Sequence, residues 1–303
     1  MSESGSHARA AGLMLASTLF FGLMAVTIRL ASHQLSTFEV AFFRNFFGLA
    51  AALPLVYRHG WAFFKTARLP RYGFRCAIGI CSMFAGFWAI GHLPLTQAIS
   101  LSYSSPLFVT MAAALFLGEK VRARRWTAVS IGFIGVMVVV RPGSESFTLG
   151  SLVALLAAVL NATASIQIKE LTATEPADRI VFWTTALWVP MSLGPALAVW
   201  QWPQGWTWAW IVAAGVLGTS GHMLWTRALK LGEVSALTTI SFMQLPIVAV
   251  AGYFLFDEVL DHYTLLGAGI IFTANAYITH REATLARRAA TDPHISREST
   301  TLR

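Results

Sequence analysis

Long apolar runs alternate with short polar connections along nearly the whole chain. A helix that crosses a bilayer needs about 20 mostly apolar residues in a row, and the polar connections divide the chain into segments of about that length. The pattern therefore predicts an all-α integral membrane protein. The ten predicted transmembrane helices cover residues 12–31, 38–57, 72–92, 96–117, 125–141, 150–169, 179–199, 207–229, 235–256 and 263–280.

The two ends of the chain are predicted to lie outside the membrane. The first apolar run is too long for a signal peptide and ends in Ile28-Arg29-Leu30, without a small-residue cleavage site, so we expect it to be retained as a helix. Residues 1–11 then form a short N-terminal segment. The polar, basic tail 281–303 is expected to be disordered.

Composition supports a membrane location. Charged residues make up 12% of the chain and apolar residues 56%, whereas a soluble domain carries about 25% charged residues. So few charges cannot cover a soluble surface, and lipid must cover the rest. Cys76 and Cys81 lie in one apolar run, without the spacing of a metal or redox site. We expect both to be reduced core residues, and we expect no metal and no cofactor.

The chain has a net charge of +8, and its basic residues are not spread evenly over the connections between the predicted spans. Basic residues in short loops mark the cytoplasmic side of a membrane protein, and here they occupy alternate connections. The opposite connections contain almost none, apart from Arg29 and Arg141 at helix ends, and one is acidic. This distribution predicts that both termini are cytoplasmic, and it does not form the single basic face of a nucleic-acid-binding protein. The predicted cytoplasmic residues include Arg58, Lys65, Arg68, Arg71, Lys120, Arg122, Arg124, Arg125, Arg179 and Lys230, and the acidic connection contains Asp257, Glu258 and Asp261.

The two halves of the chain resemble each other at a shift of about 140 residues. A polar stretch ending in Pro106 precedes an apolar run that ends in Gly118-Glu119, and another ending in Pro246 precedes a run that ends in Asp257-Glu258. Five spans per half is an odd number, so the second half enters the membrane inverted. Inverted repeats are typical of secondary transporters, which bind substrate between the halves. The predicted repeats cover residues 12–141 and 150–280.

These features together resemble the drug/metabolite transporter superfamily in its ten-helix, EamA-like form. The resemblance rests on the 5+5 repeat, the paired helix ends and prolines, and the stretch from Gly132 to Gly143. The segment 38–44, Phe-Glu-Val-Ala-Phe-Phe-Arg, is similar to a subgroup that includes S-adenosylmethionine and riboflavin uptake proteins. The resemblance implies a bacterial inner-membrane transporter that takes up a vitamin or nucleoside-like metabolite. Export of amino acids or drugs is the alternative.

Arg44 is the sharpest candidate for substrate binding. It lies roughly 9 Å into the predicted second span, where a charge is costly and normally faces protein or water. The guanidinium group could bind a carboxylate, a phosphate or an electron-rich ring carbonyl of the substrate. An internal salt bridge with Glu39 is the competing interpretation, although the i+5 spacing is imperfect.

Polar residues gather before Pro106 and Pro246, the corresponding positions of the two repeats. A proline frees a backbone carbonyl that can face a cavity, so the two stretches are expected to meet near the pseudo-symmetric centre. Tyr103 and Gln244 are the individual candidates because both can hydrogen-bond a planar ligand. Small hydroxylated residues can instead serve close helix packing.

Four further residues inside spans complete the predicted substrate site. His222 could bind substrate or carry a proton, or it could be a neutral residue bonded to a carbonyl. Trp88 and Trp225 could stack on a flat or cationic ligand. Asn161 lies on a polar stripe expected to face the other repeat. Glu119 and Glu258, in contrast, are interpreted as loop anchors that bind backbone amides or basic groups.

Two other functional classes were weighed against transport. A membrane-embedded transferase needs paired acids, a His–Asp set or a metal cluster, and a channel needs a filter signature or a ring of like charges. We find neither pattern in the sequence. We therefore expect no enzymatic activity, a small-molecule substrate, a lipid bilayer as surroundings, and a monomer or homodimer.

Overall fold

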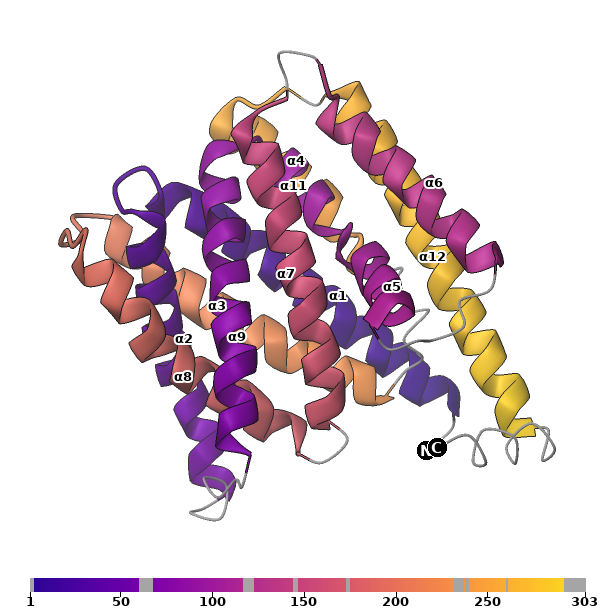
Figure 1. Ribbon diagram of the computed structural model, residues 1–303. Coiled ribbons are helices and arrows are strands. Elements are labelled where there is room, and N and C mark those ends of the chain that lie inside the picture. The colour runs from indigo at the N-terminus through magenta and orange to yellow at the C-terminus, as the bar shows by residue number, and fades with distance from the viewer. Residues whose placement is uncertain are drawn as a thin grey trace.

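The structure is a computed structural model that describes residues 3–59, 68–116, 123–143, 147–172, 175–231, 237, 240–259 and 261–291. Within these ranges it is helical and contains no strand, which confirms the all-α prediction (Figure 1). The helices are α1 (Glu3–Ala31), α2 (Thr37–His59), α3 (Leu69–His92), α4 (Leu95–Ser102), α5 (Ser105–Phe116), α6 (Ala123–Val140), α7 (Leu149–Thr172), α8 (Ala177–Leu197), α9 (Thr207–Leu231), α11 (Gln244–Phe256) and α12 (His262–Thr291).

The predicted span 96–117 is not one helix. It is split into α4 and α5, with Tyr103 and Ser104 between them. The cause is Pro106, which has no N–H group and whose ring clashes with the carbonyl four residues earlier. The predicted span 235–256 is interrupted in the same way at Phe242-Met243, four and three residues before Pro246. The other eight predicted spans each coincide with one helix.

The expectation of a disordered tail after His280 is wrong for residues 281–291. Helix α12 continues to Thr291, because Glu282, Ala283, Leu285 and Ala286 favour helix and no proline or glycine interrupts them. The remaining residues, 292–303, lie outside the described part of the chain. Helix α1 also starts earlier than predicted, at Glu3.

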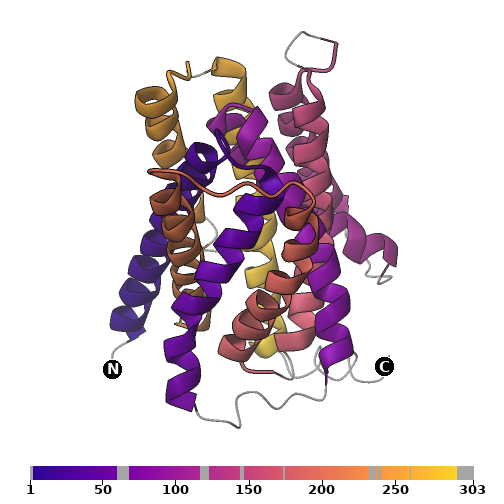
Figure 2. The same cartoon turned by 90° about the vertical axis from the view of Figure 1, so that its left-hand side faces the viewer.

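The helices form a bundle in which α1 begins and α12 ends at the same end (Figure 2). The opposite end, here called the Glu258 end, contains residues 93–94, 141–143, 147–148 and 257–259 of the connections. Helices α6 and α12 run side by side (Figure 1). Their close approach needs glycine, since a Cβ atom on Gly135 or Gly267 would lie 2.9 or 2.6 Å from the other's carbonyl oxygen.

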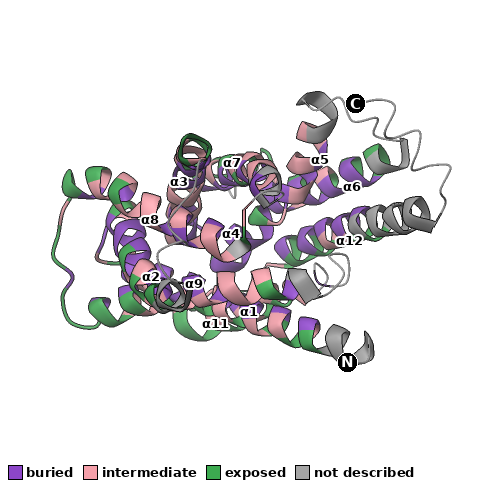
Figure 3. Cartoon of the chain, turned by 90° about the horizontal axis from the view of Figure 1, so that it is seen from below, coloured by how far each residue is buried: buried purple, intermediate pink, exposed green. Residues whose placement is uncertain are grey.

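Buried residues face the interior of the bundle, and exposed residues lie on its periphery (Figure 3). Many of these exposed residues are large and apolar, such as Leu19, Phe74 and Ile134, which suits a lipid environment. By length and composition, four helical segments within the described residues are able to cross a membrane. They are Arg9–Ala31, Leu69–His92, Leu149–Gln167 and Asp178–Leu197.

Candidate functional site

The two broken helices touch where they are interrupted. The hydroxyl of Tyr103, at the end of α4, donates to the backbone carbonyl of Ser241 at 2.5 Å and lies 3.2 Å from Oε1 of Gln244, the first residue of α11. The Tyr103 ring stacks on Phe242, with centroids 4.1 Å apart. The structure thus brings together the polar stretches that precede Pro106 and Pro246, one from each repeat.

The break in the fourth span also exposes a backbone acceptor. The amide of Leu107 bonds to Ser104 rather than to Tyr103, and the free Tyr103 carbonyl accepts a 2.8 Å hydrogen bond from Asn275 of α12. The hydroxyls of Ser100, Ser102 and Ser104 bond to carbonyls three or four residues earlier in their own segment. These serines therefore stabilise the ends of the broken helix, whereas Tyr103 and Gln244 link the repeats.

Arg44 of α2 is 4% exposed, and its guanidinium group lies against Gly218 of α9. A Cβ atom at Gly218 would lie 2.8 Å from an Arg44 terminal nitrogen, so a larger residue there would displace this side chain. Arg44 donates to the side-chain oxygen of Asn45 at 2.9 Å, and Asn45 donates to Ser192 of α8 at 3.4 Å.

The proposed Arg44–Glu39 salt bridge is wrong. Glu39 accepts instead from the backbone amides of Ser36, at 2.9 Å, and Gln201. These contacts cap the start of α2 and hold the loop before α9, so the carboxylate points away from the guanidinium group.

A second buried arginine, Arg75 of α3, was missed in the sequence. It is 7% exposed, donates to the hydroxyl of Thr184 and lies over the ring of Trp188, 5.9 Å from its centroid. Both partners are on α8. The signal was available, since Arg75 falls three residues inside the predicted span 72–92.

The other predicted site residues do not form one cluster. His222 lies one turn beyond Gly218 on α9, edge-on to Phe21 at 5.1 Å and to Trp225 at 6.4 Å. Asn161 of α7 donates to the Ser105 hydroxyl at 3.2 Å, next to the Tyr103 break. Trp88 is separate from all of these. It stacks on His92 at 3.9 Å, at the Glu258 end.

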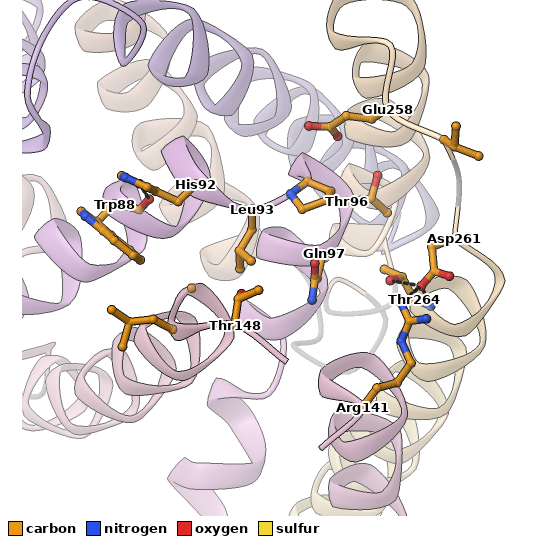
Figure 4. Close-up of a pocket in the computed structure, with 14 residues that line it drawn as sticks. Trp88, His92, Leu93, Thr96, Gln97, Arg141, Thr148, Glu258, Asp261 and Thr264 are labelled. Atoms are coloured by element: carbon orange, nitrogen blue, oxygen red, sulfur yellow. Dashed lines mark hydrogen bonds and ion pairs between the residues drawn. The ribbon is translucent and has the colours of Figure 1, made fainter. Parts of the chain in front are cut away.

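A cavity of about 480 Å³ opens at the Glu258 end (Figure 4). This volume falls within the range of roughly 300–1,000 Å³ found for small-molecule sites. Its lining comes from both repeats and includes Trp88, His92, Thr96, Gln97, Arg141, Thr148, Glu258, Asp261 and Thr264. Of these, sequence reasoning named Trp88 as a substrate contact and Gln97 as part of the polar stretch expected to line a cavity.

One ionic contact at the cavity joins four helix ends. Glu258 lies 3.5 Å from Arg29 and accepts a 2.7 Å hydrogen bond from the Leu95 amide, which starts α4. Arg29 also donates to the carbonyls of Ile90 and Leu93, at 2.7 and 3.0 Å, at the end of α3. These contacts confirm the anchoring role predicted for Glu258, whereas Glu119 lies outside the described residues. Burial raises the pKa of Glu258, and the Leu95 amide and Arg29 oppose this rise.

A second ionic contact joins α6 to α12. Arg141 lies 2.6 Å from Asp261, which also accepts hydrogen bonds from the Thr264 amide and hydroxyl at 3.0 and 2.8 Å. Partial burial acts to raise the pKa of Asp261, but the Thr264 hydrogen bonds and the Arg141 charge outweigh it, so the pKa is lowered. Arg29 and Arg141, the two exceptions to the basic-loop pattern, are therefore both paired with the acidic connection.

The fold and its two interrupted helices define a class of multi-pass membrane transporter built from two repeats. The model of the EamA-like transporter family matches residues 8–141 and 148–279, and the chain belongs to this family. The family has a ten-helix membrane fold, and its members are transporters rather than enzymes. A solved structure matches with a TM-score of 0.60 and 18% identity. The match covers 90% of this chain and 98% of the chain of that structure, and it supports the fold alone.

Relatives cover most of the chain. The S-adenosylmethionine uptake transporter of Rickettsia felis is 33% identical over 82% of this chain and 85% of its own length. The riboflavin transporter of Vibrio cholerae is 30% identical over 88% of this chain and 87% of its own length. The pseudopaline exporter CntI of Pseudomonas aeruginosa is 29% identical over 87% of this chain and 94% of its own length. All three are named as transporters of small molecules.

Proposed function

We propose that the protein takes up a vitamin or nucleoside-like metabolite, of the riboflavin or S-adenosylmethionine type, across a bacterial inner membrane by alternating access. The observation that carries this proposal is the contact between Tyr103 and Gln244. Interrupted helices that meet between two repeats form the substrate site of many secondary transporters. The relatives named for these two substrates supply the substrate class.

The path of the substrate follows the polar residues of the bundle. A solute enters the cavity at the Glu258 end, beside Trp88, and moves toward the Tyr103–Gln244 contact and then toward Arg44 and His222. Both termini are cytoplasmic in this proposal, so the cavity faces the outside. The repeats are residues 12–141 and 150–280, and the site needs one chain, as a monomer or within a homodimer. The proposed substrate contacts are Arg44, Trp88, Tyr103, Asn161, His222, Trp225 and Gln244.

Export is the second candidate direction. It is favoured by the Pseudomonas relative, which is named as an exporter. Alternating access works in either direction, because the direction of net movement depends on the gradients and on any coupled solute. The residues proposed to bind substrate would be the same.

Purified full-length protein in proteoliposomes tests the proposal. Radiolabelled riboflavin, S-adenosylmethionine and amino acids are presented separately, with protein-free liposomes as the control. Saturable uptake of riboflavin or S-adenosylmethionine is the expected result. Saturable movement of amino acids alone would replace the vitamin or nucleoside class by the exporter class, and no saturable movement of any of them would refute this substrate range.

A further inference from the structure

Two arginines lie inside the bundle without a counter-ion among the residues that the structure describes. Arg44 and Arg75 are 4% and 7% exposed, and neither forms an ion pair with a carboxylate in the described part of the chain. In contrast, Arg29, Arg141 and Arg179 each contact a carboxylate. The Nε atoms of both Arg44 and Arg75 are buried and have no hydrogen-bond partner among the described residues, a feature they share with Arg29.

One face of α8 connects the two arginines. Thr184, Trp188 and Ser192 are spaced by four residues and therefore lie on the same side of the helix. Thr184 accepts from Arg75, Trp188 lies under Arg75, and Ser192 accepts from Asn45, the side chain that also binds Arg44. The Ser192 hydroxyl in turn donates to the Trp188 carbonyl at 2.5 Å. The distance from Thr184 to Ser192 is roughly 12 Å along the helix axis.

His222 of α9 lies one turn beyond Gly218, against which the Arg44 guanidinium group lies. The described side chains around this interior region thus supply two permanent cations, neutral hydroxyls and amides, and the flat ring of Trp188. A permanent cation taken out of water is strongly destabilising unless an anion compensates it. Unlike a lysine, an arginine cannot avoid this cost by losing its proton.

We propose that Arg44 and Arg75 form an anion-binding pair, and that the transported metabolite carries a carboxylate or phosphate group that they recognise. This inference rests on the proposed function and narrows its substrate class. Within the nucleoside-like or flavin-like compounds, those that carry a carboxylate or phosphate group are the preferred substrates. Arginine suits this role because its planar donors match the oxygens of carboxylate and phosphate.

Matched substrate pairs in proteoliposomes test the preference. Riboflavin and riboflavin 5′-phosphate differ only in a phosphate group, and S-adenosylmethionine and its decarboxylated form differ only in a carboxylate. We expect the member that carries the phosphate or carboxylate group, in at least one pair, to have a KM at least about tenfold lower, since a hydrogen bond to a charged group contributes about that factor. The pair that shows the preference identifies the phosphate or the carboxylate as the recognised group.

Substitutions separate recognition from folding. Arg44→Gln and Arg75→Gln should each reduce the preference about tenfold, whereas Arg44→Lys and Arg75→Lys, which keep the charge, should retain part of it. Arg227→Gln is the matched control, because Arg227 is an exposed residue of α9. If a Gln variant fails to fold, the wild-type preference and the Lys variants still decide the question.

A binding measurement distinguishes failure of this inference from failure of the proposed function. Inorganic pyrophosphate, compared with chloride at equal ionic strength, should raise the melting temperature of the detergent-purified protein, and the Gln variants should lose this rise. Uptake of riboflavin or S-adenosylmethionine without an anion preference and without the rise would overturn the anion pair and leave the proposed function standing. The rise without uptake would overturn the proposed substrates and leave the anion pair standing, and the absence of all three effects would overturn both.

Discussion

Two kinds of arginine occur in this protein, and their partners indicate different roles. Arg29 and Arg141 contact carboxylates at the Glu258 end, where the charges hold helix ends together. Arg44 and Arg75 contact neutral groups inside the bundle. Removing one partner of an ion pair leaves the other partner as an unpaired charge, which is destabilising. Removing Arg44 or Arg75 leaves no carboxylate of the described residues without its partner. Substitution of the interior arginines should therefore affect transport more than stability.

Arg44→Ala is expected to abolish transport while the amount of protein in the membrane stays normal. The substitution removes the guanidinium group proposed to bind substrate and relieves the cost of its burial. Initial uptake rates and membrane abundance are measured together, with Arg227→Ala as the control on the exposed face of α9. Normal flux in Arg44→Ala would remove Arg44 from the site.

Tyr103→Phe tests the link between the repeats. It deletes the hydroxyl that bonds Ser241 and Gln244 but keeps the ring stacked on Phe242. We expect a loss of about 1 kcal/mol in stability, the net contribution of a typical hydrogen bond, and a several-fold lower transport rate. Thermal unfolding and uptake are compared with Tyr253→Phe, whose ring is exposed on α11. Unchanged uptake with lowered stability would make the contact structural only.

The positions of the helices could largely be predicted from the sequence, and their interruptions could not. The number and the approximate bounds of the spans follow from apolar length alone. A hydropathy average runs through the break at Tyr103-Ser104 because the apolar runs before and after it outweigh the serines beside it, although Pro106 marked the place. The same averaging hid Arg75, which lies within an otherwise apolar helix. Pairing across the bundle, as between Arg29 and Glu258, joins residues far apart in sequence and follows only from the packing of helices.

The contacts of Glu258 are expected to hold the helix ends beside the cavity together and so to limit passage from the cavity into the interior of the bundle. They join α1, the end of α3, the start of α4 and the connection after α11. Glu258→Gln removes the negative charge while keeping a group that can accept from the Leu95 amide, and it leaves Arg29 without its counter-ion. The arrangement in which these helix ends are held together should then be populated less.

Thiol labelling measures this change. Thr96 is buried in the cavity wall, and a cysteine at this position reports how far the cavity is open to a membrane-impermeant maleimide. Because Glu258→Gln loosens the helix ends beside the cavity, Thr96→Cys should react several-fold faster when Glu258→Gln is also present. Cys81 is exposed and is replaced by serine, whereas Cys76 is buried. Asp178→Asn, the same change of carboxylate to amide at the start of α8, serves as the control. Equal labelling rates in both variants would contradict this role for Glu258.

The charges of the whole molecule are distributed unequally between its two ends. At the Glu258 end, Arg29 and Arg141 are paired with Glu258 and Asp261, so this end has little excess positive charge from them. Among the described residues, Arg58 at the end of α2, Arg68 and Arg71 at the start of α3 and Arg179 at the start of α8 belong to the other end, where α1 begins and α12 ends. Because basic residues near the ends of spans are retained in the cytoplasm, the pairs strengthen the predicted orientation rather than weaken it.

Reporter fusions test this orientation. Fusions after Trp202 and after Asp261, both at the Glu258 end, should report an external location, and fusions after His59 and Leu231 should report a cytoplasmic one. Alkaline phosphatase, active only outside, and green fluorescent protein, fluorescent inside, give opposite readouts at each position. A cytoplasmic signal after Trp202 or Asp261 would reverse the direction in which the cavity opens. The proposed uptake path would then start at the other end of the bundle, and the ionic contacts of Glu258 would join helix ends on the cytoplasmic side instead.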